Sequence, residues 1–256
     1  MRKYLFKILG RQRYLRALHS SFHFMYGLGM LRSNYIYKYH YFDKNIIRKG
    51  DVVLDIGANL GYYTKLFAKW TGETGHVYAV EPVAMFAETI KWGTKNLNNI
   101  TLYNYALGAD EKDITLSTPG HFGYLRTGLA SVDKDHTGGA SEFTFKAKMK
   151  RGSQLFKDIP KIDFIKIDIE GYEYIVLPEI KDILLRHKPP IQVETWGEQK
   201  FAVETFLTDM GYDIYDIEDN KLKPVAEIRN WVQGDLLFIH KDNNGLLERL
   251  KKMGAA

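Results

Sequence analysis

The stretch Asp51-Val-Val-Leu-Asp-Ile-Gly-Ala-Asn-Leu-Gly61 decides the fold of this 256-residue chain. Residues 52–56 form a short apolar run between turn-forming residues, which predicts a buried parallel strand with Asp55 near its carboxyl end. Gly57 and Gly61 bracket a tight turn into a helix, because glycine adopts backbone angles that other residues disfavour. The free N–H groups of the first helical turn would then face the crevice where open parallel sheets bind nucleotide-like ligands.

An acidic residue at the end of the next strand indicates that the ligand contains a nucleoside. Glu81 follows the apolar run 77–80, at about the spacing where a carboxylate meets ribose hydroxyls. A dinucleotide fold usually shows G-x-G-x-x-G, whereas this turn reads Asp55-x-Gly57-x-Asn59-x-Gly61. A carboxylate suits a cation better than a pyrophosphate, and S-adenosylmethionine carries a sulfonium, an ammonium and a ribose diol. We therefore predict S-adenosylmethionine binding; the alternative is an ordinary strand-turn-helix with a structural aspartate.

The composition is that of an ordinary globular protein, with room for one large α/β domain and an appendage. No apolar run is long enough to cross a bilayer, and no signal-peptide pattern is present. The chain has no cysteine, which excludes disulfides, zinc-thiolate sites and thiol nucleophiles. A cytoplasmic protein is the simplest expectation.

The amino-terminal segment has a charge pattern of its own. It holds eight lysines and arginines and no acidic residue before Asp43. Residues 1–44 are predicted to form a basic, mostly helical appendage, and alternating tyrosines at 35–41 suggest a strand or a lid within it. Its basic and apolar residues do not separate on a helical wheel, which favours a packing helix or a homo-oligomer contact over an interfacial helix. Peripheral contact of residues 1–42 with the inner face of a membrane stays open, and nucleic acid is not expected as a partner.

Strand-like and helix-like segments alternate over residues 45–241. This pattern predicts an α/β domain with a seven-stranded, mostly parallel sheet and helices on both faces, followed by a tail at 242–256. One insertion, at about 113–149, reads as two half-exposed strands, 113–117 and 142–149, joined by a long loop. Loops of this length are usually lids, binding loops or disorder, so the loop is either a substrate cover or a flexible insertion.

A second constellation, Asp163-Phe-Ile-Lys-Ile-Asp-Ile-Glu-Gly-Tyr-Glu173, ends the fourth predicted strand of the sheet. Lys166 and Asp168 point the same way because side chains alternate along a strand. Charged groups at the end of a core strand cost desolvation unless they are paired or functional. The pair is therefore either a satisfied ion pair or part of the chemistry. Glu194, at the end of the fifth predicted strand, would add a carboxylate at the same edge.

Several of these motifs together resemble the FkbM family of S-adenosylmethionine-dependent methyltransferases. The resemblance covers residues 50–195 in order, and its most specific part is Lys166-Ile-Asp-Ile-Glu-Gly171; the other parts are Asp55-Ile-Gly-Ala-Asn-Leu-Gly61, Glu81-Pro82 and Tyr105-Ala-Leu-Gly108. It implies a class I methyltransferase (Rossmann-like) sheet with six parallel strands and a reversed final strand. It also implies O-methylation of hydroxyls on sugars, glycans or related natural products.

The resemblance also implies positions for the cofactor. It puts Asp168 beside the reacting methyl group and Glu81 on the ribose. Four residues of the first turn would surround the methionine end: Asp55, Gly57, Asn59 and Gly61. Asn104 and Ala106 would lie beside the adenine, although Tyr105 stands where class I enzymes often carry an acidic residue.

Methyl transfer to a hydroxyl needs a positioned acceptor and a group that takes its proton. The candidates for this base are Asp168, Glu170 and His121. A magnesium or manganese ion on Asp168, Glu170 and Glu194 would also lower the pKa of the hydroxyl. Candidate contacts with the acceptor are Tyr124, Arg126, Tyr172, Glu194 and Trp196.

Other functions compete with O-methylation. An RNA or protein methyltransferase would draw on the basic amino-terminal segment, but amino-group enzymes commonly carry an Asn- or Asp-Pro-Pro-aromatic motif where this chain has Asp168-Ile-Glu-Gly171. An NAD-binding oxidoreductase is disfavoured by the glycine pattern.

Overall fold

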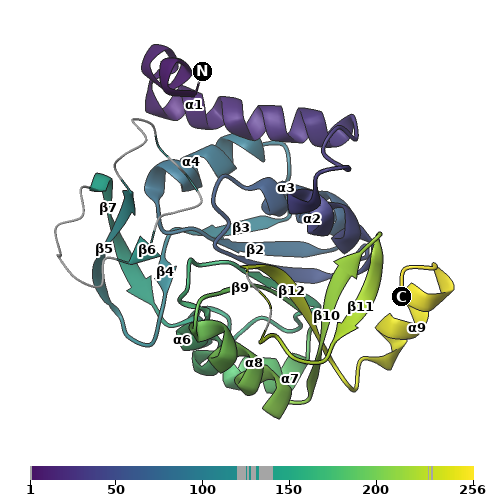
Figure 1. Cartoon of the computed structure of the whole chain (residues 1–256). Coiled ribbons are helices and arrows are strands. Elements are labelled where there is room, and N and C mark those ends of the chain that lie inside the picture. The colour runs from purple at the N-terminus through teal and green to yellow at the C-terminus, as the bar shows by residue number, and fades with distance from the viewer. Residues whose placement is uncertain are drawn as a thin grey trace.

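A mostly parallel sheet of eight strands forms the centre of this computed structural model, which describes residues 2–119, 125, 127, 131–132, 141–229, 231 and 233–256. The strand order is β11-β10-β12-β9-β8-β1-β2-β3 (Figure 1). β12 runs antiparallel to both β9 and β10, and β11 is antiparallel to β10. The bounds are β1 Val52–Ile56, β2 His76–Val80, β3 Ile100–Tyr103, β8 Phe164–Ile167, β9 Ile191–Trp196, β10 Tyr212–Glu218, β11 Lys221–Val225 and β12 Gln233–His240.

The expected α/β class is confirmed, with one strand more than the seven predicted. β11 pairs with β10 through a two-residue turn, in which Asp219 and Asn220 have φ of 48° and 60°. Two consecutive left-handed residues match the twist of a hairpin. The strand is easily missed in the sequence because Lys221, Lys223 and Pro224 are residues that edge strands use against aggregation.

Helices cover both faces of the sheet (Figure 1). On one face Val53 packs with Phe67 of α3, and on the other Leu54 packs with Leu177 of α6, as expected from the alternation along a strand. The first face carries α2 Lys38–Phe42, α3 Tyr62–Thr71, α4 Ala84–Gly93 and α9 Asn244–Lys252; the second carries α5 Gly152–Leu155, α6 Glu173–Glu179, α7 Lys181–His187 and α8 Gln199–Asp209. Leu250 of α9 is buried in this core, so the expected tail includes a packed helix.

The amino-terminal segment packs on the domain through α1 Arg2–Gly27, which kinks at Gly10 and lies over α4 (Figure 1). The prediction of a strand or lid at 35–41 is wrong: these residues form the short helices η1 Tyr35–Tyr37 and α2, followed by η2 Asp43–Asn45. The side chain of Asn34 accepts a hydrogen bond from the N–H of Ile36 and so begins the first of them. None of the helices in the described ranges is long and apolar enough to span a membrane.

A second, smaller sheet lies beside the main one in the order β4-β7-β5-β6 (Figure 1). Its strands are β4 Ala106–Leu107, β5 Lys112–Pro119, β6 Ser131–Val132 and β7 Ser141–Lys150. β5 and β7 form the antiparallel pair expected in the insertion. His121, Tyr124 and Arg126, expected in its loop, lie outside the described residues.

Candidate functional site

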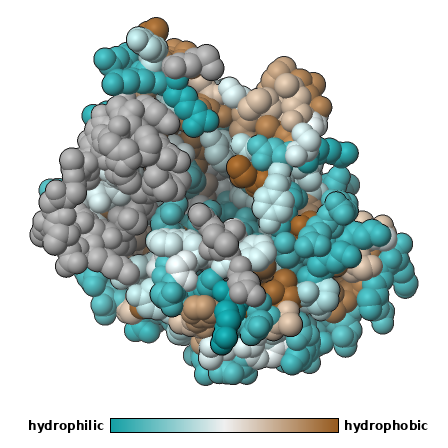
Figure 2. All heavy atoms as spheres, viewed as in Figure 1, coloured by the Kyte–Doolittle hydropathy of each residue, from teal (hydrophilic) through white to brown (hydrophobic). Residues whose placement is uncertain are grey.

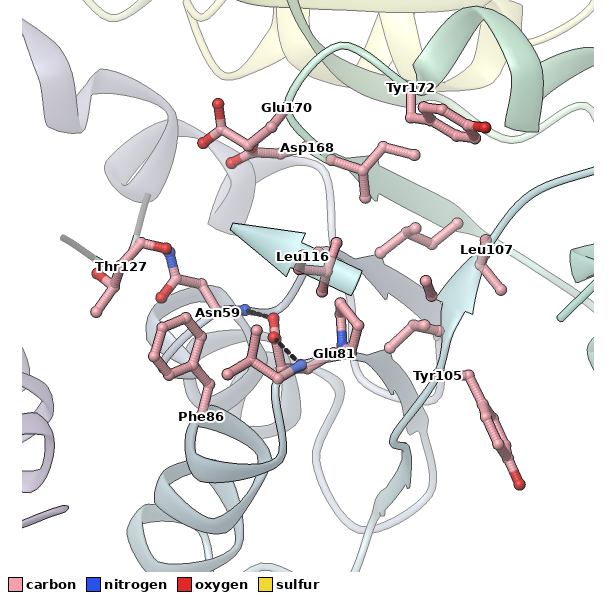
Figure 3. Close-up of a pocket in the computed structure, with 17 residues that line it drawn as sticks. Asn59, Glu81, Phe86, Tyr105, Leu107, Leu116, Thr127, Asp168, Glu170 and Tyr172 are labelled. Atoms are coloured by element: carbon pink, nitrogen blue, oxygen red, sulfur yellow. Dashed lines mark hydrogen bonds between the residues drawn. The ribbon is translucent and has the colours of Figure 1, made fainter. Parts of the chain in front are cut away.

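A cavity opens where β1, β2 and β8 end, between the main sheet and the smaller one (Figure 3). Its empty space, with the open mouth included, is about 710 Å³. The lining residues are Ile56, Gly57, Asn59, Val80, Glu81, Pro82, Val83, Phe86, Tyr105, Ala106, Leu107, Leu116, Thr127, Asp168, Ile169, Glu170 and Tyr172.

Gly57 lets two strand ends meet at this cavity. Its φ is 81°, a left-handed conformation that other residues disfavour. A Cβ at this position would lie 1.8 Å from the carbonyl oxygen of Asp168. The N–H of Asp168 in turn donates to the carbonyl of Ile56 over 3.0 Å. Only glycine therefore permits the turn after β1 to touch the turn after β8.

Glu81 is held at the floor of the cavity by two backbone donors. Its Oε2 accepts the N–H of Asn59 at 2.7 Å, and its Oε1 accepts that of Val83 at 2.8 Å (Figure 3). Burial raises its pKa to about 8, although these two N–H groups act in the opposite direction, and the nearby Asp55 and Asp168 raise it further. Each carboxylate oxygen can still accept a second hydrogen bond, which a ribose diol would supply.

Lys166 lies behind the cavity wall as the buried cation of the site. Its Nζ lies 3.0 Å from Oδ2 of Asp168, and only 3% of its side chain is exposed. Burial opposes its charge, but Asp168, Asp55 and Asp235 together raise the pKa of Lys166 above its ordinary value. Lys166 therefore stays charged and fixes Asp168.

Asp55 belongs to this buried arrangement and is not among the residues that line the cavity; its contact with the methionine end of the cofactor stays a prediction. It pairs with Lys166 in the register of β1 and β8, is fully buried, and accepts a hydrogen bond from Oγ1 of Thr64 at 2.5 Å. Burial raises its pKa, while Lys166 and Thr64 oppose the increase. We infer that Asp55 supports the turn and the lysine from behind.

Three carboxylates gather opposite Glu81. Oxygen atoms of Asp168, Glu170 and Glu194 all lie within 4.8 Å of one another, and Figure 3 shows the first two side by side. Burial, followed by the charge of Asp168, raises the pKa of Glu170 to about 8 and that of Glu194 to about 10. The cluster therefore holds protons at neutral pH and can exchange them. Hard cations favour such oxygen ligands, and the buried Oε2 of Glu194 has no hydrogen-bond partner among the residues that the structure describes.

The structure separates the predicted site residues into two groups. Seven line the cavity: Gly57, Asn59, Glu81, Ala106, Asp168, Glu170 and Tyr172. The others within the described ranges are Asp55, Gly61, Asn104, Glu194 and Trp196. Gly61 lies at the start of α3 against Ile90, and Asn104 donates to the carbonyls of Glu81 and Pro82, so it braces the loop that carries Glu81.

Sequence reasoning missed the apolar wall of the cavity. Phe86 comes from α4 and Leu116 from β5, and the carbonyl of Thr127 accepts a hydrogen bond from the Asn59 amide at 3.0 Å. The ring of Tyr105, by contrast, points away from the cavity (Figure 3). Phe86 could have been predicted at the cavity from its position in the first helical turn after Glu81. The docking of the insertion, which brings Leu116 and Thr127 to the cavity, has no local signal in the sequence.

His19 of α1 was also missed. Its Nδ1 lies 2.7 Å from the carbonyl oxygen of Leu60, within the turn that follows Asn59. Burial lowers the pKa of His19, so the ring is neutral and donates this hydrogen bond. The amino-terminal helix therefore supports the Asp55–Gly61 turn directly.

Comparison with known proteins agrees with this geometry. The family model described as Methyltransferase FkbM domain matches residues 55–214, more than half of the chain. The chain belongs to this family. The match spans both the Asp55–Gly61 turn and the Lys166–Gly171 signature, so the expected family is confirmed.

Individual relatives of this FkbM-family chain are more distant. The crystal structure of Methyltransferase FkbM from Methylobacillus flagellatus KT is similar with a TM-score of 0.53 and 17% identity, over 79% of this chain and 47% of that one. That likeness supports the fold alone. A protein-L-isoaspartate O-methyltransferase from Ignicoccus hospitalis is 38% identical over 58 residues, which is 22% of this chain and 28% of the relative. The chain thus spans less than half the length of either relative.

Proposed function

We propose that this protein is an S-adenosylmethionine-dependent O-methyltransferase whose acceptor is a hydroxyl of a sugar, a glycan or a related small natural product. Membership of the FkbM family supports methyl transfer. The observation that carries the hydroxyl acceptor is the carboxylate cluster of Asp168, Glu170 and Glu194, because a hydroxyl must lose a proton when it is methylated and these groups can take it.

The cavity supports S-adenosylmethionine as the donor. Glu81 offers free lone pairs to the two ribose hydroxyls, and the glycine turn at Gly57 allows close approach to the backbone. Phe86 and Leu116 provide an apolar wall suited to an adenine. The carboxylates opposite would attract the sulfonium and the ammonium of the donor.

In the proposed reaction S-adenosylmethionine would supply an activated methyl group, whose transfer to the acceptor oxygen would break the carbon–sulfur bond and leave its electron pair on sulfur. Asp168 would take the proton that the acceptor hydroxyl loses. We rank Asp168 first as the base because it lines the cavity, its side chain is 35% exposed, and Lys166 fixes it. Glu170 ranks second because burial and the charge of Asp168 raise its pKa to about 8, so it holds a proton at neutral pH.

A divalent cation is compatible with the same three carboxylates. Mg²⁺ or Mn²⁺ would be held by Asp168, Glu170 and Glu194, and it would lower the pKa of a hydroxyl bound to it. With such a metal bound, the three carboxyl groups would be ionised, and the activity would be sensitive to EDTA.

The test is transfer of labelled methyl from S-adenosylmethionine into a fractionated pool of glycans and lipid-linked oligosaccharides, with and without EDTA. Asp168→Asn is expected to lower turnover by a factor of about 10² to 10⁴ while the donor still binds, and the matched control Asp209→Asn, at the exposed end of α8, keeps full activity. Label found only in RNA or protein would refute the acceptor class. Full activity of Asp168→Asn would remove it from the role of base.

A further inference from the structure

The amino-terminal 42 residues form a basic cap on an acidic body. They carry eight lysines and arginines without a single acidic residue; since the whole chain has a net charge of +5, the remainder carries −3. Within the described part of the chain, Lys38 is the only one of the eight in a salt bridge, with Asp216. Most of this positive charge is therefore not offset by neighbouring carboxylates.

The same segment exposes most of the uncovered apolar side chains. Of thirteen large hydrophobic residues that are exposed in the described ranges, eight lie between residues 4 and 36. They are Tyr4, Leu5, Ile8, Phe24, Leu28, Met30, Tyr35 and Ile36, with Ile8 79% and Ile36 73% exposed. Figure 2 shows hydrophobic spheres at the upper edge of the molecule, over both ends of α1. Exposed apolar side chains concentrated in one segment are typical of an interaction surface.

The structure explains why a helical wheel fails for this segment. Tyr14 and Leu15 face inward and pack in the core cluster that contains Phe86. Phe24 and Leu28, one turn apart, face outward. Because α1 has apolar residues on both sides and kinks at Gly10, no single polar face emerges from the sequence. The inner side is satisfied by the domain, whereas the outer side remains exposed.

We propose that this outer surface of residues 2–36 binds to an anionic lipid surface. Lysines and arginines are attracted to anionic headgroups, while Phe24, Leu28 and Ile36 would enter the headgroup boundary. A second copy of the chain fits less well because contact between two such surfaces would bring like charges together. Nucleic acid would match the charge but leave the aliphatic side chains without a partner.

The test is co-sedimentation of the full chain with vesicles of phosphatidylcholine alone and with vesicles that also contain phosphatidylglycerol. Binding is expected only to the anionic vesicles and is expected to weaken as salt rises. A charge variant replaces three exposed basic side chains: Lys3→Gln, Lys7→Gln and Arg13→Gln. Its control makes the same change at three exposed lysines elsewhere: Lys157→Gln, Lys181→Gln and Lys252→Gln. At about fivefold per basic residue, the first variant should bind on the order of 100-fold more weakly, and the control should bind normally.

An apolar variant separates lipid binding from purely electrostatic attraction. Phe24→Ser with Leu28→Ser should weaken vesicle binding roughly tenfold or more, whereas the control Leu185→Ser with Met253→Ser, exposed elsewhere, should not. Absence of binding to anionic vesicles would overturn the proposal. Equal weakening of vesicle binding by the variant and its control would also overturn it. A stable dimer in solution that the two serine substitutions dissociate would do the same. RNA binding that anionic vesicles fail to displace would also overturn it. Circular dichroism of each variant checks that the fold is retained.

Discussion

Removing the buried cation should destabilise this protein more than removing the carboxylate paired with it. Lys166→Met deletes the ammonium that Asp168, Asp55 and Asp235 share, whereas Asp168→Asn leaves that ammonium with the other two carboxylates. The two partners also differ in exposure, 3% for the Lys166 side chain against 35% for that of Asp168. Water can therefore solvate the aspartate when its partner is lost, but not the groups around the lysine.

These differences set the expected magnitudes. Breaking a buried ion pair costs about 3–5 kcal/mol, which we expect for Lys166→Met because Asp55 is left fully buried beside Asp168. Asp168→Asn should cost about 1.5–3 kcal/mol at most, the range for a lost charged hydrogen bond. The loss for Lys166→Met should grow as pH rises from 5 to 8, because burial already raises the pKa of Asp55 and its ionised form becomes costlier without the lysine.

Urea unfolding measured at pH 5 and at pH 8 tests this order. The control is Lys161→Met, which removes an exposed lysine paired with Asp163 at 2.9 Å and should cost less than about 1 kcal/mol. The slope of the free energy of unfolding against urea should be unchanged if only the native state is affected. The reasoning is refuted if Lys166→Met costs no more than the control, or if Asp168→Asn proves the more damaging substitution.

Three further substitutions test the site and the amino-terminal helix packed beside it. Gly57→Ala should lower the free energy of unfolding in urea by several kcal/mol because the new Cβ would overlap the Asp168 carbonyl. The control Gly50→Ala, where φ is also positive at 88° but the nearest atom is 3.6 Å from the Cβ position, should lower it by only about 1 kcal/mol. Similar losses in the two variants would show that the structure relieves the overlap at Gly57. Calorimetry with 5′-methylthioadenosine, which keeps the ribose but lacks the amino group of methionine, should show affinity rising about tenfold between pH 7 and pH 9, because Glu81 ionises around its pKa of about 8. Glu81→Gln should abolish this dependence on pH. The same dependence in the variant would contradict the ribose contact. Burial, together with His19 and Lys65, lowers the pKa of His23 to about 3, so the ring can take a proton only after unfolding, and stability should fall as pH drops below about 6.5. The His23→Leu variant should therefore lose less stability than the unmodified protein between pH 7 and pH 5. An identical loss would mean that His23 is accessible in the native state.

The parts of the fold that were predictable from the sequence depend on local patterns. The strand–turn–helix around Gly57 follows from an apolar run, two glycines and the helical spacing after them. Residues at the carboxyl ends of parallel strands meet at one edge whatever the packing details, and this rule brought Glu81, Asp168 and Glu170 to one cavity. The meeting of these three carboxyl groups therefore follows from their positions at the carboxyl ends of parallel strands.

What could not be predicted depends on contacts between distant segments. Alternating tyrosines at 35–41 suggested a strand, but η1 and α2 form there and bury Tyr39 and Tyr41 against other parts of the fold. Leu116 reaches the cavity only because the β5–β7 hairpin docks there, and no local signal encodes that docking. The burial of Asp55 beside Lys166 was equally unpredictable, because position at a strand end alone does not show how deeply a carboxylate is buried.

The balance of charge at the sheet edge favours a cationic cofactor over a dinucleotide. Burial raises the pKa of Glu81, Glu170 and Glu194, and Lys166 is the cation that the described residues bury among these carboxyl groups. A pyrophosphate would add negative charge beside carboxyl groups that already hold protons because their mutual repulsion and burial disfavour ionisation. A sulfonium and an ammonium would instead compensate the carboxylates and allow them to ionise. An ionised carboxylate beside the methyl group is also what a hydroxyl acceptor requires, so donor binding would prepare the base for the proton that the reaction releases.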